Sequence, residues 1–177
     1  MLGSCSDSDR DVIRGRGLHL AQLSAASRAH VYEAALRAAF HVDDPALVLL
    51  IHPRVLPRTA RIAGGDPVPD SVVAALKDDG VIRGRCDPRP VAGQKTPRCD
   101  VTRPGYVVRL SDVLQLKGDT VEVFLAVTTF DTPSHPKQLL MQFENVYQIA
   151  KTSAGWTAIR EGRVPKELQV SGSDSGG

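Results

Sequence analysis

The hydrophobic pattern changes from helix-like to strand-like along the chain. Near the start, apolar residues recur at spacings of three and four, as on one face of a helix: Ala29, Tyr32, Leu36 and Phe40. Ser24 precedes this run as a candidate N-cap. Pro45 follows it, and the residue before a proline avoids helical backbone. The pattern predicts one amphipathic helix over residues 24–41.

The middle of the chain predicts shorter elements. The branched, apolar run 46–51 is typical of a buried strand. Asp70 is a candidate N-cap for a short helix over 71–79, with Gly80 at its C-terminal end. Residues 83–105 contain four prolines and predict a long, irregular loop.

The last third alternates with a period of two, as strands do. Residues 120–130 place valines and Leu125 on one side, and the other side carries Glu122, Phe124, Ala126 and Thr128. Gly118-Asp119 predicts a hairpin before this strand, and Gly155 predicts another turn before Trp156. Helices first and an antiparallel meander afterwards predict an α+β fold, in which an N-terminal helix packs on a curved C-terminal antiparallel sheet.

Length and composition fit one folded domain. The chain has 177 residues, of which 42% are hydrophobic and 24% charged, which excludes wholesale disorder. The net charge of +2 does not indicate a nucleic-acid-binding protein. We expect a flexible linker or stalk over 1–17, a single α+β domain over 18–168 and a disordered tail over 169–177.

The three cysteines fall into two groups: Cys5 stands alone near the N-terminus, and Cys86 and Cys99 lie in one loop. Cys86 and Cys99 lie in the proline-rich loop with 12 residues between them, and a disulfide there would stabilise the fold by roughly 2–3 kcal/mol. Leu2-Gly3-Ser4-Cys5 resembles the lipobox of bacterial lipoproteins, and this resemblance implies that Cys5 is lipidated. The alternative is a stray cysteine in a flexible N-terminus. Both hints favour the periplasm or cell envelope over the cytoplasm.

A second resemblance rests on Val146-Tyr147-Gln148-Ile149-Ala150-Lys151 followed by Ser153-Ala154-Gly155-Trp156-Thr157-Ala158-Ile159. This looks like the closing hairpin of the cystatin-like α+β roll, found in ketosteroid-isomerase-like and nuclear-transport-factor-two-like proteins. The likeness covers the helix and the C-terminal meander, about half the chain, while segment 52–105 departs from it. It implies a curved sheet around a pocket, and fold alone assigns no reaction.

Three sheet residues are candidates for chemistry in such a pocket. If Glu122 and Glu144 faced each other, they could act as general acid and base, with Tyr147 nearby. The alternative, which the polar alternation favours, is a solvated sheet face marked by Glu122, Gln142, Glu144 and Gln148.

The proline-rich loop is basic. Six basic side chains face only Asp87 and Asp100, and the arginines are candidates for binding an anion: Arg83, Arg85, Arg89, Arg98 and Arg103. The alternative is a solvated surface loop. The segment has no aromatic residue on which single-stranded nucleic acid could stack.

Histidines recur every 11 residues at positions 19, 30, 41 and 52. On a helix they would lie about 16 Å apart, too far to share a metal. Ser134-His135 lacks the partners of a nucleophilic site. We therefore expect no metal and no cofactor.

These observations favour a non-catalytic, exported binding or interaction domain over an enzyme. Its partner would be a small ligand or an envelope protein, with membrane contact only through a lipid anchor and a homodimer formed through the sheet. The alternative is a small ketosteroid-isomerase-like enzyme (isomerase, dehydratase or hydrolase) with a sheet-lined pocket.

Overall fold

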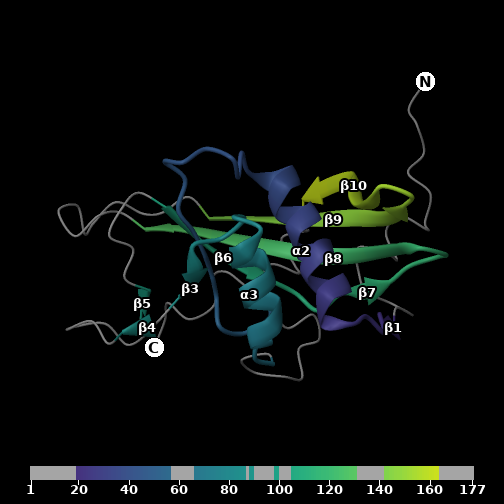
Figure 1. Cartoon of the computed structure of the whole chain (residues 1–177), viewed down its shortest axis with the longest axis horizontal. Helices are drawn as coiled ribbons and strands as arrows, with labels where there is room; N and C mark the ends of the chain where they lie inside the picture. Colours follow the sequence, from purple (N-terminus) through teal and green to yellow (C-terminus); the bar gives the residue numbers. More distant parts are fainter. Residues whose placement is uncertain are drawn as a thin grey trace.

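Two helices lie on one face of a large sheet in a computed structural model of the protein (Figure 1). They are α2 (Ala25–Ala39) and α3 (Asp70–Asp78). The structure describes residues 19–56, 66–86, 105–130 and 142–163, together with the backbone of 88–89 and 98–99. Helix and sheet in one chain fit the predicted α+β class.

Three long antiparallel strands form one side of the sheet. They are β8 (Thr120–Phe130), β9 (Gln142–Thr152) and β10 (Gly155–Arg163). On its other side β8 pairs with β6 (Gly105–Leu110) and then with β7 (Leu114–Gln115), also antiparallel. The predicted strand over 120–130 and the turns at Gly118 and Gly155 are confirmed, since both glycines have positive φ, +64° and +115°.

The sequence pattern predicted a sheet in the C-terminal third of the chain. The observed sheet also includes strands from earlier in the chain. β2 (Leu49–Ile51) lies parallel to both β6 and β3 (Gly84–Arg85), so the sheet is mixed. β1 (His19–Leu20) extends the sheet beyond β7. The parallel β2–β3 pair arises because α3 lies between these strands in the sequence, and a helical connection returns the chain in the same direction.

The predicted irregular loop over 83–105 is partly wrong. It contains β3 and a small separate hairpin of β4 (Pro88–Arg89) and β5 (Arg98–Cys99). This hairpin lies at the end of the molecule opposite β1 and β7 (Figure 1).

Local chemistry explains the ends of the helices. Ser24 is the N-cap of α2, as predicted, and its side chain accepts a 3.1 Å hydrogen bond from the Ser27 amide. Asp70 does not cap α3, because Pro69 occupies that position and Asp70 is the first helical residue. The Asp70 carboxylate instead forms an ion pair with Arg85, at 2.8 Å.

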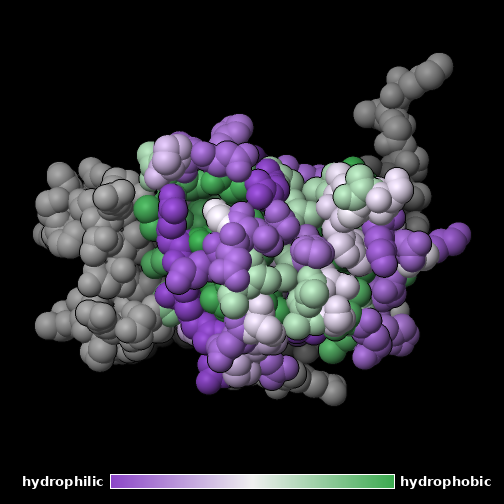
Figure 2. All heavy atoms as spheres, viewed as in Figure 1, coloured by the Kyte–Doolittle hydropathy of each residue, from purple (hydrophilic) through white to green (hydrophobic). Residues whose placement is uncertain are grey.

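The core lies between the helices and the sheet. Buried side chains of α2 and α3 pack on one face of β8 and β9; the largest are Tyr32, Leu36, Leu76, Leu125, Tyr147 and Ile149. Trp156, on β10, is half-buried against this cluster. Figure 2 shows the helix side from outside, where hydrophilic residues are spread over much of the surface with hydrophobic ones between them.

No helix in the described part of the chain is long and apolar enough to cross a membrane. Several predictions from the sequence fall outside the described residues. These are the linker over 1–17 with Cys5, the Ser134-His135 pair, Arg103 of the basic loop, and the tail over 169–177.

Candidate functional site

The sheet has a second face, turned away from the helices, which we call the distal face. Strand register and alternation place Arg109, Glu122, Phe124, Glu144 and Val146 among the described side chains on it. Except for the half-buried Arg109, these side chains are buried, and Glu122 has an exposed fraction of 0%. The expectation of a solvated polar face is therefore wrong for Glu122 and Glu144, which are buried, whereas Gln148 is half-buried and the side chain of Gln142 lies outside the described residues.

The three candidate catalytic residues do not converge. In the β8–β9 register Glu122 lies opposite Gln148 and Glu144 lies opposite Ala126. The two glutamates are thus four residues apart along the strands, roughly 13 Å at the strand rise of about 3.3 Å per residue. This distance separates backbone positions, and the register does not place the two side chains opposite each other as a cross-strand pair.

Tyr147 lies on the other face of the sheet. It pairs with Val123 and is buried in the core beneath the helices. Its hydroxyl donates to a Glu161 carboxylate oxygen at 3.1 Å, and the Asn145 amide donates to the same oxygen at 2.6 Å. Burial, reinforced by the charge of Glu161, raises the pKa of Tyr147 to about 12. A phenol with this pKa stays protonated at neutral pH and holds β9 to β10.

Arg109 brings positive charge to the distal face. Its guanidinium donates to the main-chain carbonyls of Arg54, at 3.3 Å, and Val55, at 3.1 Å. Burial and the nearby charge of Arg54 lower the pKa of Arg109. The guanidinium stays charged at neutral pH, because even a lowered arginine pKa lies far above 7.

His52 completes this basic group. Its Nδ1 accepts a 3.1 Å hydrogen bond from the Arg54 amide. Burial lowers the pKa of His52, and the charges of Arg109 and Arg54 lower it further. The imidazole is therefore neutral at pH 7, and the charge of the group comes from the two arginines.

A small apolar cluster lies next to Arg109. Leu56, Phe124 and Val146 pack together, separately from the main core. Arg109 is in register with Ala126, which packs against this cluster and lies two residues from Phe124, about 7 Å along the strand. The distal face thus combines a half-buried cationic side chain with a buried apolar cluster that is extended by the partly buried Ala126.

The predicted anion-binding arginines are only partly described. Arg85 is engaged within the fold, since it donates to the Val68 carbonyl at 2.6 Å as well as pairing with Asp70. Arg83 is exposed and donates weakly to the Pro45 carbonyl, at 3.4 Å. The side chains of Arg89 and Arg98 lie outside the described residues, as does Arg103. A cluster of all five is therefore still a prediction.

Cys86 is buried and disulfide-bonded. The backbone of Cys99 pairs with Pro88, two residues after Cys86, so the two cysteine-bearing segments lie side by side. The side chain of Cys99 is outside the described residues, and the Cys86–Cys99 pairing stays a prediction. Cys5, the lipidation candidate, is outside them as well.

Comparison with known proteins adds no identification. No protein-family model, curated protein or solved structure matches the chain. The resemblance to the cystatin-like roll, which rests on the order of the elements and on the closing hairpin, therefore stays a prediction.

Sequence reasoning missed the grouping of His52 and Arg54 with Arg109. Arg109 interrupts an otherwise apolar strand, and His52 directly follows the buried run 46–51. Charged or polar residues at such positions are a signal for a polar site on a sheet. The sequence did not show that β2 lies beside β6, which brings the two segments together.

Proposed function

We propose that the protein is a non-catalytic binding domain that works outside the cytosol and binds a small anionic ligand with an apolar body. The ligand would lie on the distal face, with its anionic group at Arg54 and Arg109. The observation that carries this proposal is the position of Arg109 beside the cluster of Leu56, Phe124 and Val146.

Chemistry favours this class of ligand. Guanidinium groups bind carboxylate, sulfonate and phosphate groups through paired hydrogen bonds. Ala126, the partly buried residue that packs against the buried cluster, is the apolar surface next to them, and burying a hydrocarbon or aromatic group there gains free energy. Binding sites for small ligands combine a few polar groups with apolar lining in this way.

We propose that the domain is non-catalytic because the acid–base candidates lie apart from one another. The backbone positions of Glu122 and Glu144 lie roughly 13 Å apart along the strands, and their side chains are not cross-strand partners. Tyr147 is on the opposite face, and its pKa of about 12 makes it a poor proton donor or acceptor at neutral pH.

Export and anchoring are part of the proposal. The disulfide at the buried Cys86 supports an oxidising compartment, where such bonds persist. The lipobox-like sequence at Cys5 supports a lipid anchor at the end of the 1–17 stalk. The partner in the envelope would then be a ligand delivered to, or held at, the membrane surface.

Titration with anilinonaphthalene sulfonate, an anionic aromatic probe whose fluorescence rises on binding, tests the site. We expect the full chain to bind it, and Arg109→Met and Arg54→Gln each to weaken binding by on the order of 10-fold, as loss of a charged hydrogen-bonding partner does. Arg163→Gln is the matched control, because Arg163 is exposed on β10 and in register with Asn145, on the helix side of the sheet. Arg54 is exposed, so its variant keeps the test valid if Arg109→Met folds poorly.

Failure to bind the probe, or equal affinity in all four proteins, would contradict the proposed site. The enzyme alternative makes a different prediction, namely isomerisation of a steroid with a Δ5-3-ketone. Turnover that disappears in Glu144→Gln or Glu122→Gln would establish that alternative in place of the binding domain.

A further inference from the structure

A second polar group lies on the helix side of the molecule, between α2 and the end of α3. It consists of His30, Glu33 and Asp79, whose candidate ligand atoms all lie within 4.8 Å of one another. His30 and Glu33 are three residues apart on α2, the spacing at which helical side chains become neighbours. Asp79 reaches them from the C-cap of α3. We propose that these three side chains bind a divalent cation of the Zn²⁺ type.

The backbone on both sides fixes the position of the ligands. The residues that flank His30 on α2, Ala29 and Val31, are buried in the core, so this turn of the helix cannot shift. The Asp79 amide donates to the Ala75 carbonyl at 3.0 Å, and Gly80 follows in the left-handed region with φ of +71°. A rigid main chain with exposed, rotatable side chains is a suitable frame for a metal site.

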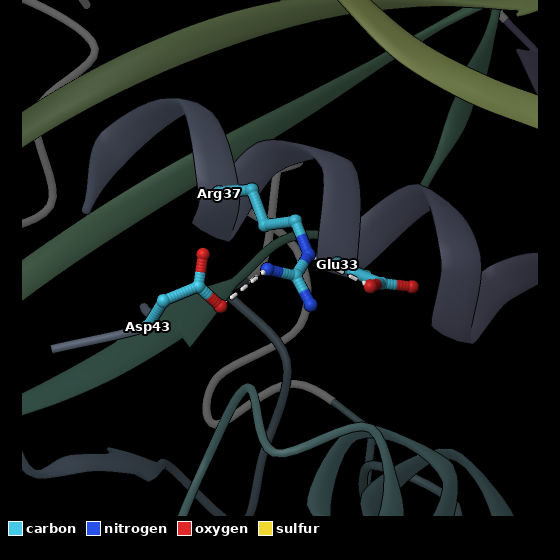
Figure 3. Close-up of polar contacts among 3 residues, drawn as sticks. All are labelled: Glu33, Arg37 and Asp43. Atoms are coloured by element: carbon cyan, nitrogen blue, oxygen red, sulfur yellow. Dashed lines mark hydrogen bonds and ion pairs between the residues drawn. The ribbon is translucent and has the colours of Figure 1, made fainter. Parts of the chain in front are cut away.

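A hydrogen bond from a neighbouring arginine already orients the carboxylate of Glu33. Arg37 donates to Glu33 Oε1 at 2.8 Å and to Asp43 Oδ1 at 3.2 Å (Figure 3). Of the two carboxylate oxygens of Glu33, Oε1 is therefore held by Arg37. Glu33 Oε2 accepts no hydrogen bond from the described residues and is the oxygen that would bind the metal. Outer partners that orient a ligand in this way are a general feature of metal sites.

The local charge favours a cation. Asp78 and Asp79 stand at the C-terminal end of α3, where the helix dipole already places partial negative charge. Lys77 in the same turn and Arg37 on α2 are the basic residues nearby. Arg37 is engaged by two carboxylates, Glu33 and Asp43, so its charge is largely balanced before a metal arrives.

The ligand set selects the metal. One imidazole and two carboxylates suit Zn²⁺ and similar first-row ions, whereas Ca²⁺ and Mg²⁺ prefer oxygen ligands alone. Ligand atoms around Zn²⁺ lie about 3.3 Å apart, given bonds of about 2.0 Å. The side chains of His30 and Asp79 are exposed, and their rotation would bring the ligand atoms from within 4.8 Å of one another to this closer spacing. Water would complete the coordination, and the bound ion would hold α2 to α3.

Calorimetric titration of the full chain with ZnCl₂ tests the proposal. The protein should carry Cys5→Ser, because a free thiolate is itself a strong zinc ligand. We expect one bound Zn²⁺ per chain, and His30→Ala and Asp79→Asn should each weaken binding by at least about 10-fold, since loss of an outer-shell partner alone has that effect. His41→Ala is the matched control, because His41 is an exposed histidine outside the cluster.

Thermal unfolding gives an independent readout. Zn²⁺ at 100 times its Kd should raise Tm by roughly 5–10 °C, and both ligand variants should lose about half of this shift or more at the same Zn²⁺ concentration while keeping the metal-free Tm. Absence of Zn²⁺ binding, unchanged affinity in both ligand variants, equal weakening by His41→Ala, or displacement of Zn²⁺ by equimolar Ca²⁺ would each overturn the proposal.

Discussion

The hydroxyl of Tyr32 on α2 donates a 2.8 Å hydrogen bond to the main-chain carbonyl of Ser111, although the two residues are 79 positions apart in the sequence. Both residues have an exposed fraction of 0%. The bond joins the middle of the helix to the point where β6 ends and the chain turns towards β7. It therefore fixes the helix relative to the sheet face on which the core is built.

Tyr32→Phe should lower the free energy of unfolding by about 1–3 kcal/mol, because the buried Ser111 carbonyl then has lost its donor. Denaturant unfolding with an unchanged m-value measures this difference. Tyr106→Phe is the control, since the Tyr106 hydroxyl forms no hydrogen bond with the described residues and its ring contacts Phe40 at 5.2 Å between centroids. The control should change stability by less than about 0.5 kcal/mol. Equal effects of the two variants would contradict the role of the bond.

The hydroxyl of Ser111 takes the place of a main-chain carbonyl as hydrogen-bond acceptor for a β8 amide. This side chain should therefore matter for stability. Its Oγ accepts from the Phe124 amide at 2.8 Å and donates to the Asp112 carbonyl at 2.8 Å. Ser111→Ala leaves the buried Phe124 amide without this acceptor and should destabilise the fold by about 1–3 kcal/mol. Ser153→Ala, in the exposed β9–β10 turn, should be nearly neutral. A loss for Ser111→Ala no larger than for Ser153→Ala would show that water satisfies the Phe124 amide.

His52 makes stability depend on pH in a defined direction. Burial is the main cause that lowers its pKa below the ordinary 6.5, so the unfolded chain binds a proton more readily than the folded one. The stabilisation is fully present above pH 6.5 and is lost as pH falls through the lower, folded-state pKa. His52→Gln removes this contribution, so the difference in unfolding free energy between wild type and variant should shrink from pH 7.5 to pH 5.

The control for this effect is His41→Gln, which removes an exposed histidine. Carboxylates titrate alike in all three proteins, so the comparison isolates the histidine. The burial of a neutral imidazole would be contradicted if the difference in unfolding free energy between wild type and His52→Gln stayed constant over this pH range or grew at low pH.

Much of the fold followed from local pattern. The helix at 25–39, the strand at 120–130 and the two glycine turns were predicted because their residues carry the period, the caps and the positive φ that those elements need. The parallel pairing of β2 was not predictable in the same way. A run of apolar residues indicates a buried strand but does not say which strand it pairs with.

The candidate site residues, like the fold, were only partly predictable from the sequence. Glu122 and Glu144 were found as the unusual residues of their strands, but their burial was not predicted. The sequence could not distinguish a covered face from a solvated one, because both show the same alternation. Likewise, His30 was set aside because the other histidines were too distant. Its partners are Glu33, three residues on, and Asp79 from another helix, which only the packing of α2 on α3 brings near.

The cysteines test the proposed compartment. Thiol titration of protein without lipid on Cys5, purified without reductant and then denatured, should find one reactive thiol per chain, Cys5, and three after reduction. Reduction should also lower the free energy of unfolding by roughly 3 kcal/mol, the value for a loop of this size. Three reactive thiols before reduction would rule out the Cys86–Cys99 bond and remove the main support for export.

The most direct test of the binding proposal is an amide chemical-shift titration of the ¹⁵N-labelled full chain with anilinonaphthalene sulfonate. We predict that the largest shifts cluster at residues 52–56, 109–111, 124–126 and 144–146, where Arg109 meets the apolar cluster on the distal face. The Arg109→Met variant should show smaller shifts at the same probe concentration. Shifts confined to α2 and α3, or spread evenly over the protein, would contradict a ligand site on this face.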